Sequence, residues 1–383
     1  MKTQRASRRA RITWRSVAVT LGIAVVIGSL AMLLIALPVQ TWRTGRAHVE
    51  PFAFSVSGPE IGPTDRIWID TDAACGTGPR TDPDDCFAIV LLLKLRSAHI
   101  AGISTVFGNA SLPVTDSTTK NLLHRIGLEQ IHAVNTYTGA AVPIDDSSTT
   151  SATPAREALQ EALAKGPLTI LSLGPLTNIA AALEQSPQLR ANVKALITVM
   201  GRRPGHIFHP AEGAAGANLL GHGPVFRDFN FAKDKEAAAR VVSMQLPLIL
   251  VPYDAGINLA IHDADLANLS RAGGVLKAIA SSTRDWLTYW KNNVGQSGFY
   301  PFDLAAAAYL LHPASFDCAT VHARVTRDQT VWTSWFYSPK ALLVSPARHL
   351  KNEAPNVAMV RYCPNARHGL KHTLLVELAA RQD

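Results

Sequence analysis

Short apolar runs alternate with amphipathic stretches through most of the chain after residue 65. Five runs have the length and the β-branched content of buried strands, at residues 66–70, 100–106, 168–173, 193–200 and 246–251. Helix-like stretches with an apolar stripe lie between them, at residues 87–96, 155–165, 177–184 and 235–244. Strands that alternate with helices indicate βαβ units, which build a mostly parallel sheet covered by helices on both faces. The sequence therefore predicts one α/β domain at residues 66–383, in which the β-rich stretch 321–363 adds a terminal hairpin or edge.

The first 65 residues have a different pattern. Residues 16–39 carry no charge, and about 20 apolar residues suffice for a helix to cross a hydrocarbon core of about 30 Å. This run is longer than the apolar region of a signal peptide, which has about 7–15 residues, and the basic residues before it favour a cytoplasmic N-terminus. We therefore expect a cytoplasmic tail at residues 1–15, a transmembrane anchor at 16–39 and a proline-punctuated linker at 40–65. The domain at 66–383 is then expected to be membrane-anchored on the periplasmic or extracellular side; a long cleaved signal is the alternative.

Composition argues against two classes of protein. Hydrophobic residues make up 47% of the chain and charged residues 17%, which is typical of a folded protein with a large core rather than of a disordered one. The formal net charge of +8 comes from the leader: eight of the 37 Lys and Arg residues lie in residues 1–46, which hold no acid, and the other 29 match the 29 Asp and Glu. A formally neutral domain lacks the basic footprint of a nucleic-acid-binding protein, so we expect no nucleic-acid partner.

Four cysteines fall into two pairs along the chain. Cys75 and Cys86 flank a loop rich in Gly, Pro and Asp, and Cys318 and Cys363 lie in the C-terminal part. In an oxidising compartment the simplest pairing is Cys75–Cys86 with Cys318–Cys363, but four cysteines allow three connectivities, and four buried thiols are a further alternative. The sequence contains neither a CxxC motif nor the Cys/His spacing of a zinc site.

Acidic residues gather around the end of the first predicted strand. Asp70 and Asp72 end the strand, and Asp82, Asp84 and Asp85 open the helix that follows. In an open parallel sheet, ligands bind beyond the carboxyl ends of the strands, and carboxylates crowded there repel one another unless a cation neutralises them. Hard carboxylate oxygens suit Ca²⁺ or Mg²⁺. Helix capping accounts for one or two of the helix-opening acids but not for Asp70 and Asp72, so the cluster predicts a divalent metal site.

Six motifs, in order along the chain, resemble those of the inosine/uridine-preferring nucleoside hydrolase family. They are Asp70-Thr71-Asp72 with Asp84-Asp85, VFGN at 106–109, LGPLTNIA at 173–180, TVMG at 198–201, DFNF at 228–231 with Asp234, and PFD at 301–303. Each motif is short, but their order is specific. The resemblance implies a nucleoside hydrolase-like, Rossmann-like α/β fold and Ca²⁺-dependent hydrolysis of the N-glycosidic bond of ribonucleosides. Members of this family commonly form dimers or tetramers, so a homo-oligomer is also expected.

The resemblance also implies roles for single residues. It assigns Ca²⁺ to Asp72, Asp85, Asp303 and the backbone carbonyl of Leu173, and it makes Asp72 the base that takes a proton from the attacking water. The nucleoside would be bound by a further set of polar side chains: Asp84, Asn109, Asn218, Asp228, Asn230 and Asp303. Carboxylates near the sugar suit this reaction because its transition state is oxocarbenium-like.

Three departures from the family pattern bear on the chemistry. Eleven residues, 73–83, separate Asp72 from Asp84 where the family has three, so that Asp82 competes with Asp84 for its role. Phe302 stands where the family usually has the histidine that protonates the leaving base. In this it resembles a branch specific for purine nucleosides, where an aromatic residue holds the base by stacking. The family's upstream HG-type loop has no counterpart, and residues 205–225 are remodelled.

Aromatic residues near Phe302 are candidates for the wall of a base pocket. Trp286 and Trp290 stand at i and i+4 on one helical face, and Tyr300 lies two residues before Phe302. Ordinary core packing is the alternative for each of them. Three histidines of the remodelled stretch are candidates to replace the missing acid, with a solvated loop side chain as the alternative: His206, His209 and His222.

Two other functions fit parts of the sequence. Loss of the acid histidine also suits a binding or regulatory protein that kept the ribose site but lost turnover. The Asp70-x-Asp72 pair also resembles that of haloacid-dehalogenase-like phosphatases, with Asp70 as nucleophile, but this interpretation leaves the GPLTNIA and DFNF stretches unexplained. The sequence therefore favours a nucleoside N-ribohydrolase with a preference for purine nucleosides.

Overall fold

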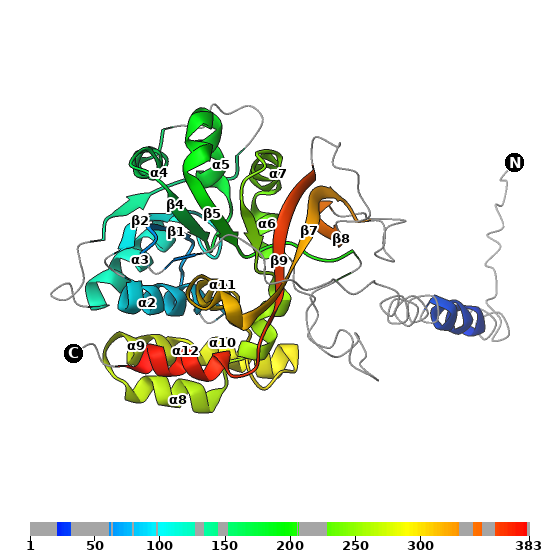
Figure 1. Cartoon of the computed structure of the whole chain (residues 1–383). Helices are drawn as coiled ribbons and strands as arrows, with labels where there is room; N and C mark the ends of the chain where they lie inside the picture. Colours follow the sequence, from blue (N-terminus) through cyan, green and yellow to red (C-terminus); the bar gives the residue numbers. More distant parts are fainter. Residues whose placement is uncertain are drawn as a thin grey trace, which may run out of the picture. The chain divides into compact units, whose positions relative to one another are not determined.

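The computed structural model describes most of the chain after residue 60 and a short helix before it (Figure 1). The described residues are 21–31, 61–62, 64–78, 80–96, 99–126, 134–144, 152–204, 206, 228–328, 340–346 and 357–380. The chain divides into two compact units, residues 1–49 and residues 50–383. The larger unit contains the sheet and all of the predicted site residues that the structure describes.

The prediction of a transmembrane anchor at residues 16–39 is wrong. Within this stretch the structure describes residues 21–31, which are helical. None of the helices in the described part of the chain has the length and apolar character needed to cross a bilayer. The predicted cellular placement of the N-terminus and of the domain depended on this anchor and fails with it. Most of the predicted linker, residues 40–60 and 63, lies outside the described residues.

A nine-stranded mixed sheet forms the centre of the larger unit, in the order β3-β2-β1-β4-β5-β6-β9-β7-β8. Neighbours from β3 through β9 run parallel, whereas β7 pairs antiparallel with both β9 and β8. The α/β prediction is therefore confirmed, and the C-terminal β-rich stretch forms the antiparallel edge. The strands are β1 Ile67–Thr71, β2 Ile100–Thr105, β3 Thr136–Thr138, β4 Leu168–Ser172, β5 Val193–Thr198, β6 Leu248–Leu250, β7 Phe316–Arg327, β8 Lys340–Pro346 and β9 Val357–Ala366.

Helices cover both faces of the sheet (Figure 1). Successive side chains of β1 alternate between the two faces, so that Ile67 and Ile69 belong to one hydrophobic core and Trp68 to the other. Helices α4, α5 and α7 pack on the face of Trp68, and the remaining long helices lie on the opposite side. The helices are α2 Asp84–Arg96, α3 Leu112–Ile126, α4 Pro154–Ala164, α5 Thr177–Gln185, α6 Phe229–Lys233, α7 Lys235–Ser243, α8 Asp263–Arg271, α9 Gly274–Ser282, α10 Arg284–Tyr289, α11 Phe302–Leu311 and α12 Leu370–Ala379.

Helix α11 connects the fold to the site. Its sequence is almost wholly apolar and rich in alanine, and it is buried against α2 and the strands β4 and β5. Small side chains allow this close approach of the helix to the sheet. As a result, the first turn of α11 meets the first turn of α2, and the backbone N–H of Asp303 donates to Asp84 Oδ2 at 2.8 Å. Two acidic residues 219 positions apart in sequence are thus held in contact.

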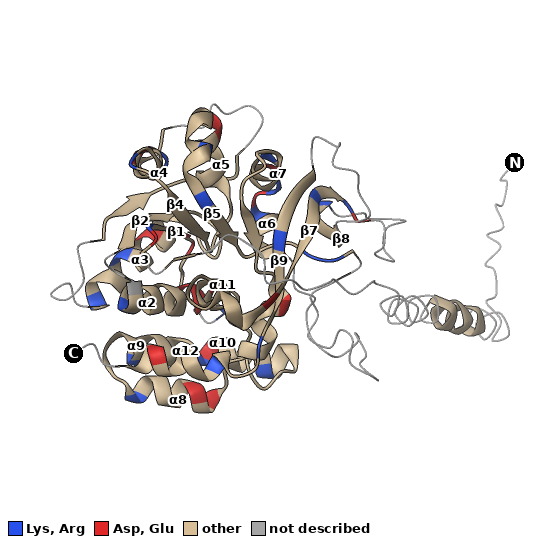
Figure 2. Ribbon diagram, viewed as in Figure 1, with Lys and Arg blue, Asp and Glu red and all other residues tan. Residues whose placement is uncertain are grey.

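Two disulfides join Cys75 to Cys86 and Cys318 to Cys363, which confirms the simplest of the predicted pairings. The first ties the loop after β1 to the first turn of α2. The second links β7 to β9 at the antiparallel edge of the sheet. Basic and acidic positions are interspersed on the described helices rather than gathered on one of them (Figure 2).

Candidate active site

Loops that follow β1 and β2 meet at the carboxyl edge of the sheet. Asp72 stands directly after β1, and its carboxylate accepts two hydrogen bonds from Asn109, from the backbone N–H at 2.8 Å and from Nδ2 at 3.4 Å. A Cβ atom at position 108 would overlap the Asp72 carboxylate, so only glycine permits this approach. The VFGN turn therefore holds the carboxylate of Asp72 in one orientation.

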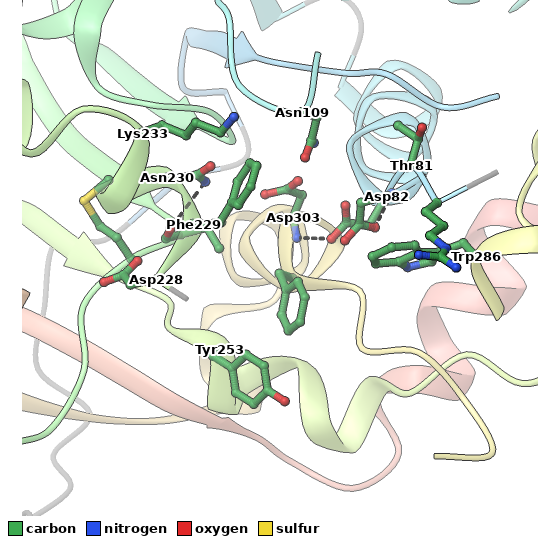
Figure 3. A pocket seen from close by; sticks show the side chains of 15 residues that line it. Thr81, Asp82, Asn109, Asp228, Phe229, Asn230, Lys233, Tyr253, Trp286 and Asp303 are labelled. Atoms are coloured by element: carbon green, nitrogen blue, oxygen red, sulfur yellow. Dashed lines mark hydrogen bonds between the residues drawn. The ribbon is translucent and has the colours of Figure 1, made fainter. Parts of the chain in front are cut away.

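Three buried carboxylates lie together beside this turn. Ligand oxygens of Asp84, Asp85 and Asp303 are all within 4.8 Å of one another. Asp84 accepts two backbone hydrogen bonds, from the N–H of Asp303 at 2.8 Å and from the N–H of Asp85 at 3.1 Å. Asn109 Nδ2 also donates to Asp85 Oδ2 at 3.1 Å, so the same amide joins Asp72 to the group (Figure 3 shows Asn109 beside Asp303).

Burial and mutual repulsion make it costly to ionise these acids without a cation. Burial, together with the charge of Asp84, raises the pKa of Asp85 to about 7. The pKa values of Asp72 and Asp303 also lie well above the usual range, because of burial first and neighbouring carboxylates second. No Lys or Arg among the described residues forms an ion pair with Asp72, Asp84, Asp85 or Asp303. A set of hard oxygen donors without a cationic side chain fits a divalent ion such as Ca²⁺ or Mg²⁺.

The predicted ligand set and the observed cluster overlap in Asp85 and Asp303. Asp84 completes the observed cluster. Asp72 is not part of it but is connected to it by Asn109, whose Nδ2 donates to both Asp72 and Asp85. The carbonyl of Leu173, at the end of β4, accepts a hydrogen bond from Asn230 Nδ2 at 2.7 Å. The assignment of the ion to Asp72, Asp85, Asp303 and Leu173 remains a prediction.

A cavity of about 420 Å³ opens above the carboxylates. Five of the six polar residues predicted to bind the nucleoside line it: Asp84, Asn109, Asp228, Asn230 and Asp303. Asp228 accepts a hydrogen bond from the N–H of Gly201 at 2.8 Å, and burial raises its pKa to about 6. Asn218 lies outside the described residues. The polar floor of the cavity thus comes from the loop after β2, from Asp228 just before α6, and from the first turns of α2, α6 and α11.

One side of the cavity is aromatic. Trp286 and Phe302 line it, and Phe302 stacks on Tyr253 with ring centroids 5.1 Å apart. Trp290 and Tyr300 do not line the cavity; their rings lie 4.8 Å apart, and both are buried against the back of Phe302. The structure therefore places two of the four predicted aromatic residues at the cavity and two behind it.

This combination of fold and site can be compared with known proteins. A sequence model of the inosine-uridine preferring nucleoside hydrolase family matches residues 67–367. The chain belongs to this family. Its membership makes it a nucleoside N-ribohydrolase, and it confirms the resemblance drawn from the six motifs.

Similar proteins agree with this placement. Two proteins named non-specific ribonucleoside hydrolase are each 29% identical to the chain. The one from Klebsiella pneumoniae aligns over 280 residues, which cover 66% of this chain and 84% of the relative. The one from Escherichia coli aligns over 266 residues, which cover 62% of this chain and 79% of the relative. A plant nucleoside hydrolase has a TM-score of 0.63 at 21% identity and covers 83% of this chain and 100% of its own. A purine-preferring ribonucleoside hydrolase from Gardnerella vaginalis also has a TM-score of 0.63, at 15% identity, and covers 82% and 98%. At these identities the two structures show a shared fold.

Sequence reasoning missed several residues that line the cavity of this nucleoside hydrolase: Arg80, Thr81, Phe229, Lys233 and Tyr253. Tyr253 follows the end of β6, where a parallel sheet places its ligands, so its position could have been inferred. Asp82 also lines the cavity. His206 is described and buried, with Nε2 3.3 Å from Asp254 Oδ1, but it does not line the cavity. His209 and His222 lie outside the described residues.

The Cys75–Cys86 disulfide closes the loop that carries Arg80, Thr81 and Asp82 to the cavity of this nucleoside hydrolase. Serine at both Cys75 and Cys86 should destabilise the chain by about 3 kcal/mol, the chain-entropy value for so short a loop. It should also raise KM several-fold, because the three lining residues lose their anchor. Thermal unfolding and initial rates with a nucleoside measure the two effects.

The second disulfide supplies the matched control. It closes a longer loop, since Cys318 and Cys363 are 45 residues apart, so serine at both should cost about 4 kcal/mol. Neither cysteine lines the cavity, and KM should therefore stay the same. Equal changes of KM in the two double variants would show that the first disulfide has no particular effect on the site.

Proposed function

We propose that this nucleoside hydrolase cleaves purine ribonucleosides to free base and ribose and depends on Ca²⁺. The observation that carries the proposal is the group of buried carboxylates of Asp84, Asp85 and Asp303, which has no cationic partner among the described residues and lies under a cavity with an aromatic wall. Asp85 and Asp303 would hold the ion with Asp72 and the carbonyl of Leu173. A bound divalent ion would activate a water molecule and grip vicinal hydroxyls.

Asp72 acts as the general base in this proposal. It is fully buried, and the two hydrogen bonds from Asn109 fix its carboxylate beside the acidic group. A positioned carboxylate of raised pKa is suited to take a proton from water near neutral pH. The attacking oxygen forms its bond to C1′ as the C1′–N bond breaks, and the electron pair of that bond leaves with the base. Asp72 takes one proton of the water, the other stays on the new 1′-hydroxyl, and the base takes up a proton from solvent.

The ribose lies over the carboxylates. Asp84 has both oxygens oriented by backbone N–H groups and lines the cavity, so its remaining lone pairs face a ribose hydroxyl. Asn230 donates its Nδ2 to the carbonyl of Leu173, which leaves its Oδ1 to accept from a second hydroxyl. Negative charge from buried carboxylates stabilises the oxocarbenium-like transition state.

The aromatic wall favours a purine as the leaving base. Phe302 has no proton to donate, so the base is held by its faces rather than protonated at this position. Stacking on an aromatic side chain contributes about 1–3 kcal/mol per base, and a bicyclic purine offers more area than a pyrimidine. Trp286 and Phe302 both reach the cavity and supply these faces.

Full-length protein with Ca²⁺ should therefore release base and ribose from inosine or guanosine with a kcat/KM at least about tenfold above that for uridine. Trp286→Ala should reduce kcat/KM for inosine about tenfold and kcat/KM for uridine by less. The ratio of the two kcat/KM values therefore measures the contribution of stacking on the base. Base release measured by chromatography gives both numbers. Nucleoside binding in calorimetry without release of ribose would instead support the regulatory protein.

The phosphatase alternative has no support in the site. Asp70, its nucleophile, is fully buried and does not line the cavity. Its Oδ1 accepts hydrogen bonds from Asn178 Nδ2 at 2.8 Å and from the hydroxyl of Ser104. These contacts connect β1 to α5 and β2, so Asp70 is part of the framework beneath the cavity.

A further inference from the structure

Two cationic side chains line the cavity although a nucleoside is neutral. Lys233 Nζ lies 4.8 Å from the ring centroid of Phe229, and both residues line the cavity. The Arg80 guanidinium lies 5.2 Å from the ring centroid of Tyr289, which stacks on Trp286. Neither cation forms an ion pair with a carboxylate in the described part of the chain.

The two cations stand at different ends of the cavity. Arg80 belongs to the aromatic side, through Tyr289 and Trp286. Lys233 lies at the end of α6, three residues after Asn230, and residues at i and i+3 share one face of a helix. Figure 3 shows Lys233 and Trp286 on opposite sides of Asp303.

The chemistry of the ribose decides which part of a substrate meets Lys233. In the proposed function, on which this inference rests, the base at C1′ lies against the aromatic wall and the 2′- and 3′-hydroxyls face the carboxylates. The remaining substituent is the 5′-hydroxymethyl group on C4′, and Lys233 is the cationic side chain that lines the cavity away from the aromatic wall. A hydroxyl there needs no ammonium group, whereas a phosphate ester carries about −1.5 to −2 charge at pH 7 and binds lysine as a point charge.

We infer that the cavity accepts ribonucleoside 5′-monophosphates and that Lys233 binds the 5′-phosphate. The two acids that flank α6 do not oppose this. Figure 3 shows Asp228 on the far side of Asn230 from Lys233, and its Oδ2 accepts the N–H of Gly201. Asp234 does not line the cavity and accepts the backbone N–H groups of Ile144 and Ala237. The reaction is then hydrolysis of inosine 5′-monophosphate. The C1′–N9 bond breaks, water oxygen bonds to C1′, and its protons go to the base and to the new 1′-hydroxyl. The products are hypoxanthine and ribose 5-phosphate.

The test compares inosine with inosine 5′-monophosphate as substrates of the full-length protein in the presence of Ca²⁺. Hypoxanthine release gives both rates, and mass spectrometry of the sugar product distinguishes ribose 5-phosphate from ribose left by a contaminating phosphatase. The wild type should show a kcat/KM for the nucleotide at least tenfold above that for inosine. Lys233→Met should lower this ratio at least tenfold, and Lys233→Arg should restore most of it.

Two further variants complete the experiment. Lys277→Met removes one positive charge from the exposed face of α9, away from the cavity, and should leave the ratio within twofold of the wild type. Lys233→Gln repeats the charge loss if the methionine variant fails to fold. Hydrolysis of inosine with a slower rate on the nucleotide, or a ratio unchanged in Lys233→Met and Lys233→Gln, overturns the inference and leaves the proposed function intact. Hydrolysis of neither substrate overturns the proposed function itself.

Discussion

Asp72→Asn should lower kcat for inosine by about 10³-fold, within the range of 10²–10⁴ that a general base contributes. Asparagine has the shape of aspartate, and its amide oxygen can still accept the backbone N–H of Asn109 that Asp72 accepts at 2.8 Å. The amide cannot take a proton from water, however, so the loss should fall on kcat rather than on folding. Rates at saturating inosine, together with the melting temperature, separate the two.

Glu157→Gln is the matched control for this variant. Glu157 is exposed in the first turn of α4, which packs on the Trp68 face of the sheet. Its substitution makes the same chemical change, from a carboxylate to an amide. It should leave kcat unchanged. An Asp72→Asn enzyme that kept more than a tenth of the wild-type kcat would remove Asp72 from the role of base, whatever its place near the acidic group.

The regular elements of the sheet could be predicted because each buried strand is an apolar run of strand length. Residues 66–70 were predicted and Ile67–Thr71 is observed, since almost every side chain there enters a core. Helix α2 begins three residues earlier than its apolar pattern indicates, because Asp84 and Asp85 occupy its first turn, where the helix dipole favours acids. Strand β3 escaped prediction because Thr136–Thr138 is short and only half-buried, so it leaves no apolar pattern.

The anchor prediction failed for a different reason. It depended on the length and hydropathy of an uncharged run, residues 16–39. Hydropathy alone does not establish a helix long enough to cross a bilayer, and none of the helices in the described part of the chain has that length and apolar character.

The site could be predicted where polar residues follow strand ends and could not where side-chain direction matters. Asp84, Asn109 and Asp303 meet at the cavity because the carboxyl ends of parallel strands share one edge. The i, i+4 spacing of Trp286 and Trp290 predicted a shared face, and their ring centroids lie 6.3 Å apart, but the spacing does not show which of the two reaches the cavity. Trp286 lines the cavity, whereas Trp290 is fully buried behind it against Tyr300 and Phe302.

Without Ca²⁺ the domain should lose stability as the pH rises from about 4 to about 8. In the folded state the pKa of Asp85 is raised from 3.8 to about 7, and burial and neighbouring carboxylates raise those of Asp72 and Asp303 as well. The folded state therefore binds more protons than the unfolded chain across this interval. The contribution of the protonated carboxylates to the free energy of unfolding is fully present below the unfolded pKa near 4. It is lost as the pH rises through the folded pKa near 7.

Calcium should reverse this dependence, because the ion neutralises the carboxylates that protons neutralise at low pH. Binding at 100 times Kd stabilises a protein by about 2.7 kcal/mol, which corresponds to a rise of about 5–10 °C in melting temperature for a domain of about 150–250 residues and to a smaller rise for this larger one. At pH 8 the melting temperature in Ca²⁺ should thus exceed that in a chelator by several degrees, and at pH 4.5 the difference should nearly vanish.

Asp85→Asn tests whether this linkage belongs to the cluster. The amide keeps the shape of the side chain but removes a group whose pKa is displaced, so the variant without metal should lose less stability between pH 4.5 and pH 8 than the wild type does. It should also gain little from Ca²⁺, since one hard anionic ligand is lost. Differential scanning fluorimetry of both proteins at the two pH values, with Ca²⁺ and with chelator, provides the comparison. Equal melting temperatures with Ca²⁺ and with chelator in the wild type at pH 8 would show that the carboxylates reach neutrality without the ion, and the metal site would then have no physical basis.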